Sequence, residues 1–119
     1  MDYEQLRIII RRYLAQWRHG TLDEIAVQEK AEEIWDALDE EDVDVDKSHP
    51  HAAVLEVLHD LSVLGWRTIV REDIPAILRF LDASPADLSQ AWRDYHAYWD
   101  GIDYEKRKQT LQGSSFYIL

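Results

Sequence analysis

The feature that most constrains the fold is an apolar segment in the middle of the chain, residues 48–65, with the sequence SHPHAAVLEVLHDLSVLG. At about 100° per residue, its valines and leucines cover roughly half of a helix circumference. Glu56, His59 and Asp60 form the polar strip that remains. A surface helix normally buries a narrower stripe, so this segment is expected to pack against two or more neighbours. The sequence therefore predicts a central helix at about 49–64 that other helices surround.

Composition also favours an all-α fold. The chain has 119 residues, of which 46% are hydrophobic, but it has only four glycines and three prolines. So few turn-forming residues favour a few long helices over many short strands. A chain of this length ordinarily forms one domain and buries a core of its own. We therefore expect an all-α, single-domain bundle of five to six helices over residues 1–119.

Apolar residues at helical spacing predict helices on both sides of the central one. Two precede it, at about 3–18 and 21–39, two start after Asp73 and Ser84, and a shorter one lies at about 103–112. The side chains expected to cap exposed backbone N–H groups are those of Asp2, Thr21, Ser48, Asp73 and Ser84.

Residues 66–70 and 113–119 lie outside the predicted helices. Residues 66–70 read as an extended connector, with a short pairing to the apolar tail at 113–119 as the alternative.

In the 103–112 helix, Lys106, Arg107 and Lys108 are expected to be exposed. In the helix after Ser84, Tyr98 lies off the apolar stripe and is a candidate contact residue.

The net charge of −11 is concentrated in one third of the chain. Residues 21–60 carry fourteen acidic side chains and two lysines, and residues 39–46 alone carry six acids. Repulsion among these six is expected to keep residues 39–47 an extended loop. A field of this sign repels nucleic-acid phosphates and anionic membranes, and it attracts a basic protein. The expected partner is therefore a basic protein, with no nucleic acid and no membrane, and the oligomeric state stays open.

Several classes of chemistry lack the residues that they need. There is no cysteine, which excludes disulfides, thiolate catalysis and cysteine-based zinc sites. The start of the chain does not read as a signal peptide, and no run of about 20 apolar residues is present, so a soluble, cytoplasmic protein is expected. A glycine-rich phosphate loop, GxSxG and HExxH are all missing. We therefore assign no catalytic residue and no cofactor.

Two parts of the sequence, residues 42–46 and the histidines of the predicted central helix, contain residue types that bind metals but lack the required spacing or ligands. Alternating acids at 42–46 match the opening of an EF-hand loop, but Lys47 replaces the required glycine and Ala53 the bidentate glutamate. His51 and His59 are eight residues apart, too far along a helix to share an ion. No metal site is predicted.

The first functional hypothesis is a non-catalytic interaction protein that binds its partner through residues 21–47. A concrete version is an immunity-type inhibitor, a small acidic protein that covers the nucleic-acid site of a toxin nuclease. Size, charge and helix content suggest this version, and no family motif supports it. The residues expected to contact the partner are Glu33, Asp36, Asp39, Glu40, Glu41, Asp42, Asp44 and Asp46.

The second hypothesis is a small enzyme or ligand-binding protein. Its pocket would lie between the central helix and the helix that follows Ser84, with His51, Tyr95 and His96 in the lining. Both hypotheses are consistent with the sequence, and the electrostatic one is favoured because the charge asymmetry is the stronger signal.

Overall fold

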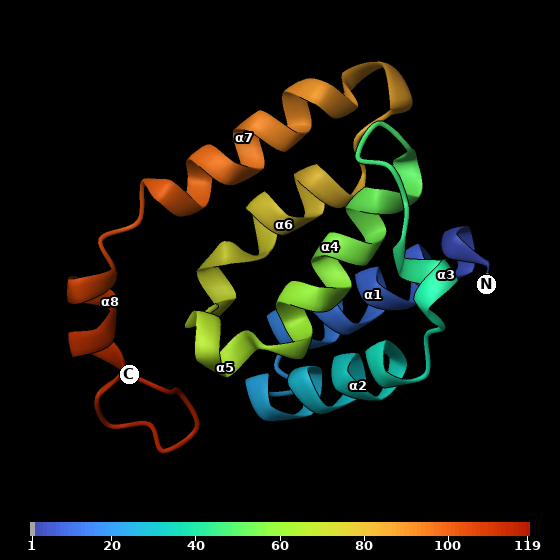
Figure 1. Cartoon of the computed structure of the whole chain (residues 1–119). Coiled ribbons are helices and arrows are strands. Elements are labelled where there is room, and N and C mark those ends of the chain that lie inside the picture. The colour runs from blue at the N-terminus through green and yellow to red at the C-terminus, as the bar shows by residue number, and fades with distance from the viewer. Residues whose placement is uncertain (1) are drawn as a thin grey trace.

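The computed structural model describes residues 2–119, which fold into α-helices joined by turns and two short 3-10 helices (Figure 1). The α-helices are α1 (Tyr3–Arg18), α2 (Glu24–Asp36), α3 (Glu40–Val43), α4 (Pro50–Ser62), α5 (Leu64–Arg67), α6 (Ile74–Leu81), α7 (Leu88–Asp100) and α8 (Tyr104–Leu111). The 3-10 helices are η1 (Arg71–Asp73) and η2 (Pro85–Asp87), and the described residues contain no β-strand. The all-α prediction is confirmed. The helix count exceeds the prediction because α3 and α5 are single turns that apolar periodicity does not reveal.

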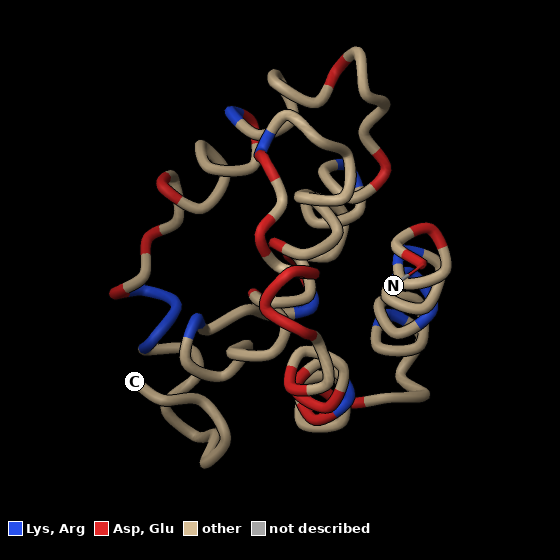
Figure 2. Tube along the Cα trace, turned by 45° about the vertical axis from the view of Figure 1, so that its right-hand side comes forward, with Lys and Arg blue, Asp and Glu red and all other residues tan. Residues whose placement is uncertain are grey.

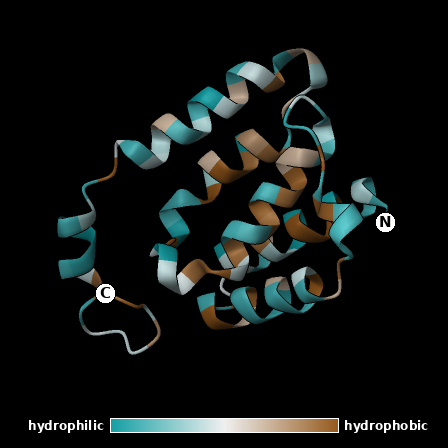
Figure 3. Cartoon of the chain, viewed as in Figure 1, coloured by the Kyte–Doolittle hydropathy of each residue, from teal (hydrophilic) through white to brown (hydrophobic). Residues whose placement is uncertain are grey.

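Helix α4 is central, as predicted, and contacts α1, α2, α5 and α6. Figure 3 shows that hydrophobic residues concentrate on α4, α1 and α6 in the middle of the molecule, whereas α8 is hydrophilic. The N-cap of α4 is His49, whose ring accepts a hydrogen bond from the backbone of His51. The predicted cap, Ser48, instead turns back to bind the carboxylate of Asp46. Pro50 at the first helical position explains the start, because its fixed φ suits a helix N-terminus.

Helices α1 and α2 pack on one side of α4 and run in opposite directions (Figure 1). Gly20 in their connection has φ +83°, a left-handed value that glycine adopts without strain. Helix α1 and its Asp2 cap match the prediction, since the Asp2 carboxylate accepts the backbone N–H of Gln5. Helix α2 starts later than predicted, with Asp23 rather than Thr21 as its cap. It ends at Asp36 instead of about residue 39.

The acidic segment after α2 is not an extended loop, which corrects the prediction for residues 39–47. Its first part forms α3, where the Asp39 backbone N–H donates to the Asp42 carboxylate at 3.3 Å. From α1, the Tyr3 hydroxyl donates to the Asp42 backbone carbonyl at 2.6 Å. Carboxylates in a first helical turn interact favourably with the helix dipole. Local capping and this tether therefore outweigh the charge repulsion.

The connection after α4 is also more helical than predicted. Trp66 and Arg67 belong to α5, which ends at Arg67 and is followed by Thr68 with φ 55°. The C-terminal tail docks on this turn without forming a strand. The Ile118 backbone N–H donates to Gly65 at 3.1 Å, and the Tyr117 hydroxyl donates to the Ile69 carbonyl at 2.7 Å.

Helix α7 packs along α6, and α8 lies at the periphery of the fold (Figure 1). Helix α6 begins after η1, where Asp73 is buried and makes no side-chain cap bond to α6. Its carboxylate accepts the backbone N–H of Val70 instead, at 2.8 Å, so the predicted capping role is wrong. Within residues 2–119, no helix is both long enough and apolar enough to cross a lipid bilayer.

Candidate functional site

The carboxylates predicted to contact a partner lie together on α2, α3 and the loop that follows. Figure 2 shows acidic residues along α2 and α3, with basic residues on α1 and α8. We call this set the acidic face: Glu33, Asp36, Asp39, Glu40, Glu41, Asp42, Asp44 and Asp46. All except Asp42 are exposed, and these exposed carboxylates form no ion pair with a described residue. The face therefore presents seven exposed carboxylates, those other than Asp42, whose charge no basic side chain within the described residues neutralises through an ion pair.

A shallow cavity of about 250 Å³ lies beside the acidic face. We call it the aromatic pocket, and its lining residues are Trp35, Val43, Val45, Lys47, Ala52, Leu55, Glu56, His59 and Trp92. These residues come from α2, the α3 region, α4 and α7, so the pocket exists only once the four segments pack. The rings of Trp35 and His59 are 4.8 Å apart between centroids.

Trp92 of α7 contacts Lys47, which directly follows the acidic residues 39–46. Its indole N–H donates to the backbone carbonyl of Lys47 at 3.1 Å. The ammonium of the same lysine lies 5.3 Å from the centroid of the Trp92 ring. The Trp92 ring also packs edge-on against the Phe80 ring, with the two ring centroids 4.8 Å apart. The wall formed by α7 is therefore anchored in the core.

Acidic residues of the face are direct chain neighbours of the pocket lining. Asp42 and Asp44 flank Val43, and Asp36 follows Trp35. Protein interfaces commonly place an apolar, aromatic centre inside a polar rim, and most of the binding energy comes from that centre. The aromatic pocket and the acidic face are adjacent along the chain, as the centre and rim of such an interface would be.

The structure does not place the three residues of the alternative ligand pocket around one cavity. His51 stacks on Tyr3 with centroids 4.2 Å apart, and burial lowers its pKa. Tyr95 is buried in the core, and its hydroxyl donates to Asp60 at 2.6 Å. His96 is exposed and stacks on Trp92 at 5.6 Å. The rings of Tyr95 and His96 contact edge-on with centroids 6.4 Å apart, but Tyr95 is buried in the core while His96 is exposed to solvent.

Sequence reasoning missed a buried carboxylate on α4. Asp60, assigned to the polar strip, is only 1% exposed, and it accepts the Tyr95 hydroxyl and faces Arg67 with an N–O distance of 3.1 Å. Burial raises the pKa of Asp60 to about 6, although the Arg67 charge acts in the opposite direction. A detectable signal existed, because Val57 and Leu64 lie three residues before and four residues after Asp60, the spacing of one helix face.

A second buried carboxylate, Asp73, binds the guanidinium of Arg107 with N–O distances of 2.8 and 3.0 Å. The Arg107 side chain is 16% exposed, so its predicted exposure is wrong. Tyr98, the candidate contact residue, donates its hydroxyl to the same carboxylate and is half-buried. Burial and the bond to Asp73 raise the pKa of Tyr98 to about 12. No local pattern announces this cluster, because its members are far apart in the chain.

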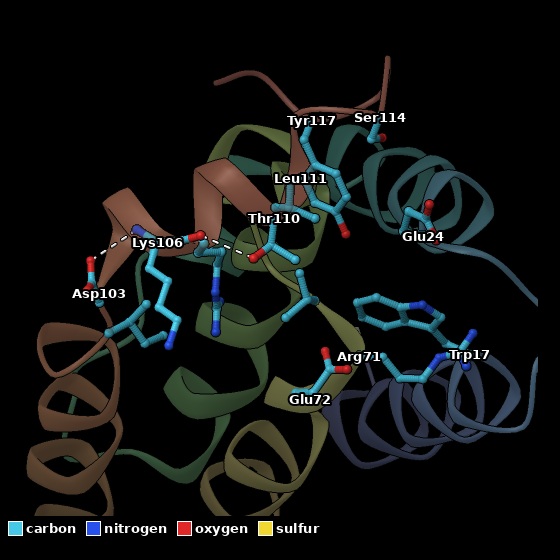
Figure 4. Close-up of a pocket in the computed structure, with 13 residues that line it drawn as sticks. Trp17, Glu24, Arg71, Glu72, Asp103, Lys106, Thr110, Leu111, Ser114 and Tyr117 are labelled. Atoms are coloured by element: carbon cyan, nitrogen blue, oxygen red, sulfur yellow. Dashed lines mark hydrogen bonds between the residues drawn. The ribbon is translucent and has the colours of Figure 1, made fainter.

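A cavity of about 730 Å³ lies elsewhere, between α8, the tail and the start of α2. Figure 4 shows Lys106 and Thr110 on one side, Trp17 and Glu24 opposite, and Arg71 and Glu72 below. Basic and acidic side chains alternate around it, so its chemistry favours no single class of ligand. Among residues 2–119, no three His, Asp or Glu side chains are grouped so as to hold a metal ion.

Comparison with protein families, with curated proteins and with solved structures finds no match for this chain. The acidic face and the aromatic pocket are therefore the features from which we infer a function.

Proposed function

We propose that this protein is a non-catalytic interaction protein that docks a basic protein partner on its acidic face. One observation carries the proposal: exposed carboxylates that form no ion pair with a described residue lie next to the lining of an aromatic pocket along the chain. Complementary charge accelerates encounter and selects against wrong partners, while an apolar centre slows dissociation. In this proposal the acidic face accelerates the encounter with the partner, and the aromatic pocket slows its dissociation.

The short helix α3 strengthens the proposal. A flexible acidic loop would lose conformational entropy on binding, and preformed structure reduces that loss. Capping by Asp42 and the tether from Tyr3 hold α3 in place before any partner arrives. An inhibitor that covers the basic nucleic-acid site of an enzyme is the form of partner recognition that this surface suits best, because its charge mimics the phosphates that such a site binds.

The test measures binding of a defined basic probe, a peptide of alternating arginine and glycine, by calorimetry at low and high salt. Wild-type protein is expected to bind at low salt and to lose affinity as ionic strength rises, because exposed charges are screened. The variant Glu40→Gln/Glu41→Gln/Asp44→Asn is expected to bind about tenfold more weakly, at about 0.5 kcal/mol per exposed charge.

A matched control removes the same charge elsewhere. Glu72, Asp100 and Glu105 are exposed and lie outside α2 and α3. The variant Glu72→Gln/Asp100→Asn/Glu105→Gln is expected to bind nearly as wild type. Equal affinities of the two triple variants would show that net charge, not the acidic face, governs binding, and the proposal would be wrong.

A further inference from the structure

The aromatic pocket already holds a cation, which belongs to the chain itself. The Lys47 ammonium lies 5.3 Å from the centroid of the Trp92 ring. A cation within about 6 Å of an indole face is attracted by the negative potential of the ring. Lys47 is exposed and forms no ion pair with a described residue, so the ring is the contact that orients its ammonium.

The other walls of the pocket also suit a basic side chain. Glu56 is half-buried in the lining and supplies a carboxylate, and Trp35 supplies a second indole. Val43, Val45 and Leu55 form an apolar surface. Long basic side chains pack their methylene stems on such surfaces while the charged end reaches a polar group. Aromatic rings, one carboxylate and an apolar floor together fit a lysine or arginine side chain better than an aliphatic one.

We propose that the aromatic pocket binds one lysine or arginine side chain of the basic partner, and that this side chain displaces Lys47 from Trp92. The inference rests on the proposed function and deepens it, because it names the group that anchors the partner. Lys47 then acts as an internal competitor, so the free protein keeps its pocket filled until a partner engages the acidic face. Two results would contradict this proposal: an aliphatic side chain in the pocket, or binding by diffuse charge attraction with no side chain in the pocket.

The first measurement follows the tryptophan indole N–H signals by NMR during titration with the arginine–glycine peptide. The chain has five tryptophans, and single substitutions assign their signals. The Trp35 and Trp92 signals are expected to shift, whereas those of Trp17, Trp66 and Trp99 stay in place. The same peptide with citrulline, a neutral analogue of arginine of the same shape, is expected to leave all signals unchanged. Shifts with citrulline would indicate an apolar anchor and overturn the proposal.

The second measurement compares affinities of two lysine variants with the same change in charge. Lys47→Met removes the competitor, and Lys106→Met removes an exposed lysine on α8. Both increase the net negative charge by one, but Lys47 lies next to the acidic face, so the excess affinity of the Lys47 variant that persists at high salt, where exposed charges are screened, reports release of the pocket. We expect that excess to be about threefold, which corresponds to a cation–π contact at an exposed site. Equal affinities of the two variants would overturn the competitor role.

A third pair tests the carboxylate in the pocket. Glu56→Gln is expected to weaken peptide binding several-fold more than Glu105→Gln, an exposed position on α8 with the same charge change. If the acidic-face variant loses binding while Lys47→Met and Glu56→Gln behave like their controls, the docking surface stands and the anchor is wrong. If the acidic-face variant binds as wild type, the proposed function itself fails.

Discussion

Two aspartates are buried in this protein, and they differ in how completely they are paired. Asp73 is fully buried, and each of its oxygens receives a hydrogen bond from the Arg107 guanidinium. The Tyr98 hydroxyl and the Val70 backbone N–H also donate to it. Because these donors come from α7, α8 and the turn before η1, Asp73 ties three parts of the C-terminal half together.

Asp60 is almost as buried but has fewer donors. Tyr95 donates to one oxygen, and Arg67 faces the other oxygen at 3.1 Å without making a hydrogen bond to it. The Trp99 indole N–H in the same region is buried and has no hydrogen-bond partner among the described residues. Burial alone therefore does not determine how many hydrogen bonds a carboxylate accepts. Asp73 accepts four hydrogen bonds and anchors three parts of the chain, whereas Asp60 accepts one and has a pKa raised to about 6 by burial.

The largest expected effect comes from breaking the complete pairing of Asp73. Arg107→Ala leaves a buried carboxylate without its counter-charge, and loss of one partner of a buried pair costs about 3–5 kcal/mol. We expect urea unfolding at neutral pH, followed by circular dichroism, to show a loss of this size. Lys106→Ala, an exposed neighbour on the same helix, is expected to change stability by about 0.5 kcal/mol or less. Similar losses in the two variants would mean that Asp73 does not anchor α8.

The incomplete pairing of Asp60 predicts a pH dependence. Burial raises its pKa from 3.8 to about 6, so the folded state binds the proton more tightly than the unfolded state. This contribution to stability is present below pH 3.8 and is lost as the pH rises through about 6. The loss amounts to about 3 kcal/mol at 1.4 kcal/mol per pKa unit. Unfolding free energies measured between pH 4 and 7 should fall less steeply in Asp60→Asn than in wild type. An unchanged slope would contradict the assignment.

Two tyrosine substitutions compare the carboxylates directly. Tyr95→Phe removes the one hydroxyl that donates to Asp60, whereas Tyr98→Phe leaves Asp73 bonded to Arg107. A hydrogen bond to a charged group contributes about 1.5–3 kcal/mol. We expect Tyr95→Phe to lose stability within that range, and Tyr98→Phe to lose about 1 kcal/mol because other donors remain. The reverse order in urea unfolding would show that donor number does not control these sites.

The smallest effect is expected at Trp99. Trp99→Phe gives up ring contacts in the core but also removes a buried N–H that has no partner, and such a group costs about 1–3 kcal/mol when left unsatisfied. Trp17→Phe is the control, because that side chain is buried to a similar degree and its indole nitrogen is not a buried group without a partner. Thermal unfolding should show a smaller drop in Tm for Trp99→Phe. A larger drop would mean that the Trp99 N–H is satisfied in solution.

The local elements could be read from the sequence because their causes are local. Apolar residues at helical spacing predicted α1 and α4, and the Asp2 carboxylate caps α1 as expected. The eight carboxylates of the acidic face gather on α2 and the α3 region because they are close in the chain. Boundaries were less predictable at Thr21 and Ser48, where the caps are Asp23 and His49. Asp23 lies two residues after Thr21 and His49 directly follows Ser48, and the geometry of the preceding turn decides which side chain reaches the free N–H groups.

The sequence by itself determined the helical class, the central position of α4 and the concentration of negative charge, since these follow from periodicity and composition. Only the tertiary structure decided which distant groups meet. Tyr3 reaches Asp42 across 39 positions, and Trp92 reaches Lys47 across 45. Such pairs depend on how helices pack, and helical periodicity states which face is buried without naming its partner. The aromatic pocket and the two buried aspartates are therefore properties of the fold, whereas the acidic face is a property of the sequence.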